Sequence, residues 1–217
     1  MAKLFFLYSA MNAGKTTNLL QVAYNYRERD MRPFLMLPEF DCRSGFGVIG
    51  SRIGLSADAH TYSVHDNLFE RLEQAHLMER IDCVLIDEAQ FLTAAQVDQI
   101  SLFVDTINIP VMCYGLRTDF QGELFPGSAR LLALADEVRE LKTICWCGKK
   151  ATMVLRVDDQ GRVVSTGAKI QIGGNMHYHS VCRKHWRKQI YAKRPQDSDQ
   201  LESNNFSEEC YTEILSD

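Results

Sequence analysis

Residues 3–16 read KLFFLYSAMNAGKT, an apolar run followed directly by a loop of small residues that ends in Gly-Lys-Thr. The apolar part, Lys3–Ser9, predicts a buried strand, and the stretch from Lys15 to about Arg29 predicts a helix with an apolar stripe. A strand, a small-residue loop and a helix N-terminus together favour phosphate, because backbone N–H groups and the helix dipole both attract an anion. The stretch therefore predicts a nucleotide-binding α/β domain.

The loop matches the pattern G-x-x-x-x-G-K-[ST], except that Ser9 stands where the pattern has its first Gly. In this pattern the lysine reaches the β- and γ-phosphates and the final hydroxyl holds Mg²⁺, which assigns these tasks to Lys15 and Thr16. The alternative is a plain strand–turn–helix in which Gly14 only shapes the turn. The predicted phosphate-binding residues are Ser9, Ala10, Met11, Asn12, Ala13, Gly14, Lys15 and Thr16.

A second apolar run, Val84–Ile86, ends in Asp87 and Glu88. Such a strand is the expected partner of a phosphate loop, and its first acid, Asp87, is predicted to hold Mg²⁺. Glu88 is then free for acid–base chemistry at the carboxyl edge of the sheet, where ligands bind in open α/β folds. The alternative is a solvated strand end that happens to carry two acids.

Strand and helix patterns alternate along the first 140 residues. Further strands are expected over 32–37, 83–86 and 109–114, and helices over 67–78 and from a capping box at 93–96 onward, whereas the glycine-rich stretch 39–66 reads as a long, mobile loop. The alternation predicts a mostly parallel sheet with helices on both of its faces. Together with the phosphate-loop pattern, we expect an α/β fold of the P-loop, RecA-like class.

Composition limits the class of protein. The chain has 217 residues, of which 46% are hydrophobic and 24% charged, close to the average of soluble globular proteins. It contains neither a membrane-length apolar run nor a signal-peptide pattern, which predicts a cytoplasmic protein. Seven unevenly spaced cysteines indicate free thiols and a metal site rather than a disulfide scaffold, with Cys83 and Cys113 as buried thiols.

Charge divides the chain into three segments. Residues 1–140 hold 12 Lys/Arg against 19 Asp/Glu, residues 141–194 hold 12 against 2, and residues 195–217 hold none against 7. This pattern, with the phosphate loop in the first segment, predicts a nucleotide-binding body at 1–140, a small basic domain at 141–192 and a disordered acidic tail at 193–217. Within the basic domain, Asp158–Gly161 between two short apolar runs is typical of a hairpin.

Three cysteines and a histidine indicate a structural zinc site in the small domain. Cys145-Trp-Cys147 and Cys182-Arg-Lys-His185 supply a Cys₃His set, which suits tetrahedral zinc, and a domain with little core benefits from a metal. The C-x-C spacing is unusual. His177 and His179 are rival ligands, and two reduced cysteine pairs without metal are the alternative.

Four motifs in this order give the chain a family resemblance: SAMNAGKT (9–16), DEAQF (87–91), TDFQGELF (118–125) and IGGNMHYHSVC (172–182), the last running into CRKH. From residue 3 to about 190 the chain resembles the type II thymidine kinases, P-loop kinases with a zinc-bearing lasso domain. The resemblance implies transfer of phosphate from ATP to the 5′-hydroxyl of thymidine, with Mg²⁺ and structural zinc. It also implies a homotetramer and feedback inhibition by thymidine triphosphate.

The resemblance also assigns individual residues. Glu88 is implied as the base that takes the 5′-hydroxyl proton, and Gln90 joins Asp87 among the nucleotide-binding residues. The expected thymidine contacts are Leu116, Phe120 and Phe125 around the base, the main chain of Lys169, Ile170, Gln171, Ile172 and Gly173, and Tyr178. The departures from the family pattern are Ser9, the C-x-C pair and His185, where other members have Cys.

Two other functions fit part of the sequence. A nucleic-acid-dependent ATPase would explain the phosphate loop, the DEAQ acids and the basic zinc domain, but the chain has neither a second motor domain nor a convincing arginine finger after Tyr114. A zinc-ribbon interaction module with a vestigial phosphate loop conflicts with the intact Lys15, Thr16, Asp87 and Glu88. The sequence therefore predicts small-molecule partners, thymidine and ATP, rather than nucleic acid or membrane.

Overall fold

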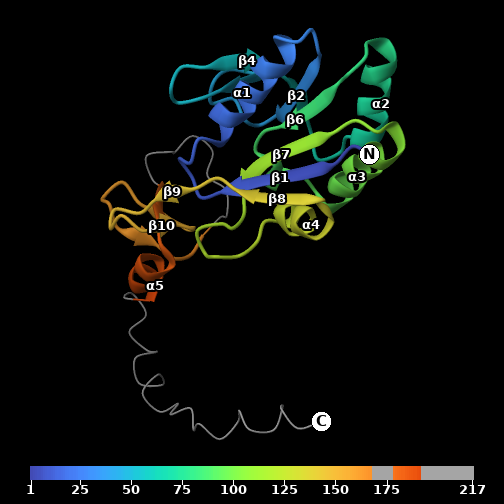
Figure 1. The fold of residues 1–217 in the computed structure, drawn as a ribbon. Helices are drawn as coiled ribbons and strands as arrows, with labels where there is room; N and C mark the ends of the chain where they lie inside the picture. Colours follow the sequence, from blue (N-terminus) through green and yellow to red (C-terminus); the bar gives the residue numbers. More distant parts are fainter. Residues whose placement is uncertain (168–177, 192–217) are drawn as a thin grey trace, which may run out of the picture.

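The computed structural model describes residues 1–167 and 178–191 (Figure 1). Its largest unit is a six-stranded sheet of order β5-β2-β6-β7-β1-β8, in which every neighbouring pair of strands is parallel. The strands of this sheet are β1 (Leu4–Ser9), β2 (Pro33–Pro38), β5 (His60–Tyr62), β6 (Cys83–Ile86), β7 (Val111–Leu116) and β8 (Glu137–Glu140). The predicted parallel α/β architecture is confirmed.

Helices cover both faces of the sheet, because alternate residues of each strand point to opposite faces. From β1, Leu4 and Phe6 join a core beneath three helices, whereas Leu7 joins a second core with Leu19 and Leu20 on the other side. The helices of the first core are α2 (Leu68–Met78), α3 (Ala94–Ile107) and α4 (Pro126–Leu134), and the second core lies beneath α1 (Lys15–Arg27). A 3₁₀ turn, η1 (Ala89–Phe91), follows β6.

Local capping fixes where two predicted helices begin. Thr93 Oγ1 accepts from the Gln96 backbone N–H at 3.1 Å, and the Gln96 side chain accepts from the Thr93 N–H at 3.1 Å, so the predicted capping box of α3 is confirmed. Asn67 caps α2 through the Glu70 N–H at 3.3 Å. Cys83 and Cys113 are fully buried thiols, as predicted.

The expectation of a loop without regular structure over 39–66 was wrong. This stretch contains β3 (Val48–Gly50) and β4 (Ser56–Asp58), which pair as an antiparallel hairpin, and β5, which forms an edge of the main sheet. Each strand is only three residues long. A run this short carries too few alternating residues to show a period, and its partner strand supplies the stabilising hydrogen bonds.

Two elements near the end of the first domain went unpredicted. Helix α4 begins at Pro126, where proline is tolerated because the first helical N–H needs no partner. Strand β8 reads Glu-Val-Arg-Glu and has no apolar run, yet it pairs with β1 from Phe5↔Glu137 to Tyr8↔Glu140. It forms the other edge of the sheet, where charged side chains reach water.

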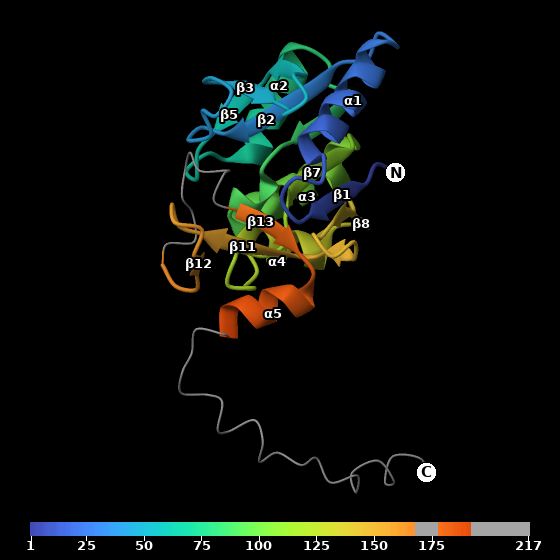
Figure 2. The same ribbon diagram turned by 90° about the vertical axis from the view of Figure 1, so that its left-hand side faces the viewer.

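A small second unit lies beyond the carboxyl ends of the sheet strands (Figures 1 and 2). It consists of β9 (Thr143–Ile144), β10 (Lys150–Ala151), β11 (Met153–Val157), β12 (Val163–Val164), β13 (Tyr178–Val181) and α5 (Arg183–Tyr191). Strands β11 and β12 form the predicted hairpin around 158–161, and β13 pairs with β11 on its other side. The predicted acidic tail, 193–217, lies outside the described residues, and the division of the chain at residue 140 stays a prediction.

No helix within the described ranges is long and apolar enough to cross a membrane.

Gly127 marks the tightest contact between α4 and η1. A Cβ at this position would lie 2.5 Å from the carbonyl oxygen of Leu92 and 2.9 Å from that of Ala89, both of them backbone atoms that cannot rotate away. We therefore expect Gly127→Ala to lower the free energy of unfolding by about 1–3 kcal/mol through overpacking. Urea unfolding measures this, with Ala129→Ser, at an exposed position of the same helix, as the control. Equal stability of the two variants would contradict the tight contact.

Candidate active site and metal centre

The loop after β1 places a lysine inside the protein. Gly14 adopts a left-handed conformation at φ 77°, and α1 begins at Lys15 directly after it. The Lys15 ammonium is buried and donates hydrogen bonds to Ser9 Oγ at 3.0 Å and to the Ala10 carbonyl at 3.2 Å. Burial lowers its pKa, with the carboxylates of Glu88 and Asp87 acting in the opposite direction. The lysine is thus held against the loop, and an incoming phosphate could replace both of its contacts.

Asp87 meets the phosphate loop through Thr16. The Thr16 hydroxyl donates to Asp87 Oδ2 at 3.0 Å, which joins the start of α1 to the end of β6. Burial, together with the neighbouring Glu88 charge, raises the pKa of Asp87 to about 7. A hydroxyl and a buried carboxylate that lacks a strong cation partner are oxygen donors of the kind that Mg²⁺ prefers, so these residues fit the predicted magnesium site.

Glu88 occupies a strained position at the carboxyl edge of the sheet. Its backbone is left-handed, with φ 51° and ψ 38°, which is uncommon outside glycine and occurs often at functional sites. One carboxylate oxygen accepts from the Gln90 side-chain amide at 2.5 Å, and the other forms an ion pair with Arg43. Burial acts to raise its pKa, but the charges of Arg43 and Lys15 outweigh burial and lower it. Glu88 is therefore a carboxylate at neutral pH.

Arg43 belongs to this site although the sequence analysis did not identify it. Besides Glu88, it binds Asp41 with two hydrogen bonds of 2.7 Å, from Nε to Oδ1 and from Nη2 to Oδ2. These contacts raise the pKa of the guanidinium above its ordinary value. The available signal was an Asp-x-Arg triplet inside a glycine-rich loop. That signal was weak, because the partner Glu88 lies 45 positions further along the chain.

A cavity of about 600 Å³ unites most of the predicted site residues. Predicted residues on its wall are Met11, Asn12, Ala13, Gly14, Lys15, Thr16, Asp87, Glu88, Gln90, Leu116, Phe120, Phe125 and Tyr178. Ser9 and Ala10 are buried at the base of the phosphate loop and do not line it. The lasso residues Lys169, Ile170, Gln171, Ile172 and Gly173 lie outside the described residues. Roles at this site stay predictions.

Aromatic side chains form part of the cavity wall. The Phe125 ring meets Phe91 edge to face at 5.9 Å between centroids, and Phe91 meets Phe40 in the same way at 5.0 Å. Buried Asp119 accepts from the backbone N–H groups of residues 121 and 123, at 2.9 and 3.0 Å, and so fixes the turn that carries Phe120. The wall suits a planar apolar group beside polar ends.

Gln90 connects Glu88 to the end of β7. Its amide donates to Glu88, and its carbonyl oxygen accepts from the Leu116 backbone N–H at 2.9 Å. The side chain is 1% exposed, so both of its ends are satisfied by protein. Gln90 thereby sets the distance between the Glu88 carboxylate and the end of β7.

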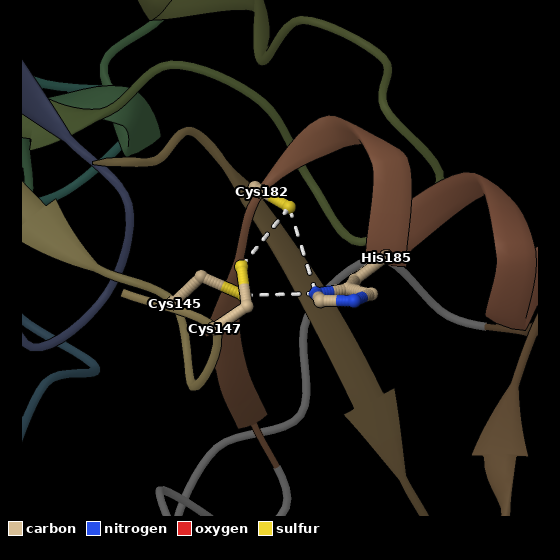
Figure 3. A group of neighbouring side chains, drawn as sticks. All are labelled: Cys145, Cys147, Cys182 and His185. Atoms are coloured by element: carbon tan, nitrogen blue, oxygen red, sulfur yellow. Dashed lines mark hydrogen bonds between the residues drawn. The ribbon is translucent and has the colours of Figure 1, made fainter. Parts of the chain in front are cut away.

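The four predicted zinc ligands meet in the small unit (Figure 3). The donor atoms of Cys145, Cys147, Cys182 and His185 all lie within 4.8 Å of one another. Sulfur–nitrogen distances are 3.2 Å from Cys145 and 3.6 Å from Cys182 to His185 Nδ1, and the Cys147–Cys182 sulfurs are 3.9 Å apart. A tetrahedral zinc site has edges of about 3.6 Å for S–N and about 3.8 Å for S–S. The donor set therefore fits zinc.

Local structure explains how the unusual C-x-C pair converges. Cys145 and Cys147 lie in the turn between β9 and β10, closed by hydrogen bonds from the Cys145 N–H to the Lys149 carbonyl at 2.8 Å and from the Gly148 N–H to the Cys145 carbonyl at 2.9 Å. Burial acts against ionisation of Cys145, but hydrogen bonds from the Cys147 backbone and from His185 lower its pKa to about 6. Metals bind the thiolate form.

One of the two rival ligands, His179, is not part of this cluster. His179 is an exposed residue of β13, outside the group of four, and His177 lies outside the described residues. Trp146 stacks on the His185 ring at 5.0 Å and 28°, which restrains the orientation of the imidazole.

The small unit contacts the active-site loops directly. The Ser180 hydroxyl donates to the Met11 carbonyl of the phosphate loop, and Thr143 Oγ1 donates to the Asn12 carbonyl at 3.4 Å. On the other side, Trp186 Nε1 donates to the Phe120 carbonyl at 2.9 Å. The small unit therefore contacts both the phosphate loop and the turn that carries Phe120.

Comparison with known proteins assigns the chain to a family. The family model described as thymidine kinase matches residues 2–186. A thymidine kinase of Shewanella oneidensis is 57% identical over 88% of this chain and 100% of its own length, and one of Jannaschia is 56% identical over 88% and 97%. A crystal structure of the Pif1 helicase from Candida albicans aligns with 66% of this chain and 36% of its own, at 16% identity and a TM-score of 0.40, and a likeness of that size supports no inference. The family match spans both structural units, and on this ground the chain belongs to the thymidine kinase family.

Proposed function

We propose that this protein transfers the γ-phosphoryl group of ATP to the 5′-hydroxyl of thymidine, and of deoxyuridine, giving ADP and the nucleoside monophosphate. One observation carries the proposal: a single cavity holds a phosphate loop, the Glu88 carboxylate and an aromatic wall. The relatives' names as thymidine kinases support the choice of nucleoside. The activity would serve nucleotide salvage and supply thymidylate for DNA synthesis.

At the phosphate end, the proposed reaction depends on positive charge that binds the ATP phosphates. Backbone N–H groups of residues 9–16 and the Lys15 ammonium would hold the ATP phosphates, and Mg²⁺ held by Thr16 and Asp87 would supply further positive charge there. Lys15 already lies beside this position. Its two hydrogen bonds, to uncharged oxygens of Ser9 and Ala10, could be replaced by a phosphate. Positioning and electrostatics then provide most of the acceleration.

The nucleoside end of the reaction rests on Glu88. Leu116, Phe120 and Phe125 would surround the base, with Tyr178 against the nucleoside and the main chain of 169–173 on the base edge. Each Glu88 oxygen keeps a free lone pair beside its Gln90 or Arg43 contact, so the carboxylate can accept the hydroxyl proton. An apolar wall beside this carboxylate excludes water, which would compete with the hydroxyl as acceptor.

Further parts of the proposal follow the family resemblance. We infer one structural zinc ion per chain, a homotetramer, feedback inhibition by thymidine triphosphate and a cytoplasmic location. The donor geometry of the four ligands supports the zinc; the other three rest on the resemblance alone.

A phosphate-transfer assay separates this proposal from a nucleic-acid-dependent ATPase. Radiolabelled ATP is offered with thymidine, deoxyuridine, deoxycytidine, deoxyadenosine or single-stranded DNA. We expect labelled monophosphate from thymidine and deoxyuridine only. ATP turnover stimulated by DNA, with no labelled nucleotide, would support the ATPase and refute the kinase.

We expect Glu88→Gln to lower kcat by about 10²-fold or more, because glutamine keeps the size and one acceptor but cannot take the proton. ATP affinity should change little, since Lys15, Thr16 and Asp87 remain. The matched control is Glu79→Gln, which breaks an Arg32–Glu79 ion pair of 2.9 Å outside the cavity. Near-normal kcat in Glu88→Gln would exclude the base role, and loss of ATP binding would make Glu88 a metal-site residue.

We expect elemental analysis to find one zinc per chain, and Cys182→Ser to lose it because the site then has only three strong ligands. His179→Asn is the matched control, since this exposed histidine is close in sequence but outside the cluster. A chelator should lower the unfolding temperature of the wild type and leave that of Cys182→Ser unchanged. Full zinc content in Cys182→Ser would overturn the assignment.

A further inference from the structure

The segment between β2 and β4 places two arginines on the cavity wall, Arg43 and Arg52. Among the described residues of that wall, Lys15 is the only other Lys or Arg. Three cations therefore face the space where phosphate would bind. The two arginines differ in what they already contact.

Arg43 is fully engaged by the protein. Its guanidinium binds both Asp41 and Glu88, whose side chains are only 12% and 13% exposed. If Arg43 left these partners for a phosphate, two partly buried carboxylates would lose their counter-charge, which is costly where water is scarce. Arg43 is therefore suited to hold Glu88 in place rather than to follow a transferring group.

Arg52 is available. Across the described part of the chain its guanidinium forms neither a hydrogen bond nor an ion pair, although its side chain lines the cavity. Its positive charge also reaches the Lys15 ammonium, where it acts to lower the pKa of that lysine. Arg52 and Lys15 thus line the same cavity and lie close enough for their charges to interact.

The backbone that carries Arg52 is a closed turn rather than a loose loop. It links β3 to β4, and the Ser51 N–H donates to the Leu55 carbonyl at 2.7 Å while the Gly54 N–H donates to the Ser51 carbonyl at 3.1 Å. The Leu55 N–H also donates to Ser51 Oγ at 3.0 Å. Because the turn is fixed by hydrogen bonds at both ends, Arg52 is presented to the cavity from a defined backbone position.

We propose that Arg52 is a catalytic residue whose guanidinium contacts the transferring phosphoryl group. The inference rests on the proposed kinase function and deepens it. In the step, the 5′-hydroxyl oxygen bonds to the γ-phosphorus, the bond from the γ-phosphorus to the β–γ bridging oxygen breaks with its electron pair going to ADP, and the hydroxyl proton passes to Glu88. Charge on the transferring oxygens is stabilised by a planar donor with several N–H groups.

The test is Arg52→Gln in the full-length, zinc-containing protein, measured with ATP and thymidine. Glutamine keeps polarity and removes the charge, and position 52 is exposed outside the core, so the fold should persist. We expect kcat to fall by about 10³-fold, the lower end of measured arginine-finger effects, with the KM for thymidine and the affinity for ATP nearly unchanged. Leu55→Ala, on the same turn but off the cavity wall, is the matched control and should retain wild-type kcat.

The outcomes distinguish the proposed kinase function from the proposed role of Arg52. Wild-type protein that does not phosphorylate thymidine refutes the proposed function itself. Wild-type protein that is active, with Arg52→Gln matching Leu55→Ala in kcat, refutes only the role of Arg52. An Arg52→Gln protein with normal kcat and a raised KM for ATP also refutes it, because the contact would then be made equally in the ground state and in the transition state.

Discussion

All six strands of the central sheet run in the same direction, so their carboxyl ends meet at one edge. The phosphate loop follows β1, Asp87 and Glu88 follow β6, and Leu116 ends β7, and these three strands are neighbours in the order β6-β7-β1. Groups that are separated by about 70 or 100 residues in the chain therefore converge at this edge, because neighbouring parallel strands end side by side. The hydrogen bond of 3.0 Å between Thr16 and Asp87 is a direct result of this convergence.

Asp87 and Glu88 lie next to each other at this edge, and their mutual repulsion has an electrostatic cost. The other contacts of the site reduce that cost. Asp87 is buried and the adjacent Glu88 is partly buried, so charging both has a high energetic cost. The structure resolves the conflict in favour of Glu88, whose charge is held by Arg43 and Gln90, while the pKa of Asp87 rises to about 7. Asp87 consequently lacks a cation of its own, and this deficit is what a bound metal ion with ATP would satisfy.

The sequence predicted those parts of the fold and the site whose information is local. The phosphate loop, the acidic end of β6, the capping box at Thr93 and the hairpin around 158–161 each depend on residues within about ten positions, and all four lie where the sequence placed them. Arg43 was missed because its importance comes from Glu88, a partner that only the tertiary fold brings near. Strand β8 was missed for the same reason: its charged sequence is a strand only because β1 offers an open edge.

The four predicted zinc ligands indicate how a bound metal would act at a distance from the proposed chemistry. Among the described residues of the small unit, the core comprises seven buried residues, two of which are the predicted ligands Cys145 and Cys182, so packing alone is a weak constraint on its shape. Yet this unit contacts the phosphate loop through Ser180 and the aromatic wall through Trp186. Restraining β9, β13 and α5 at one point fixes these contacts relative to each other. A zinc ion bound by the predicted ligands would thus help to fix the shape of the cavity, and its loss would affect the positions of Met11 and Phe120 before it affected the main sheet.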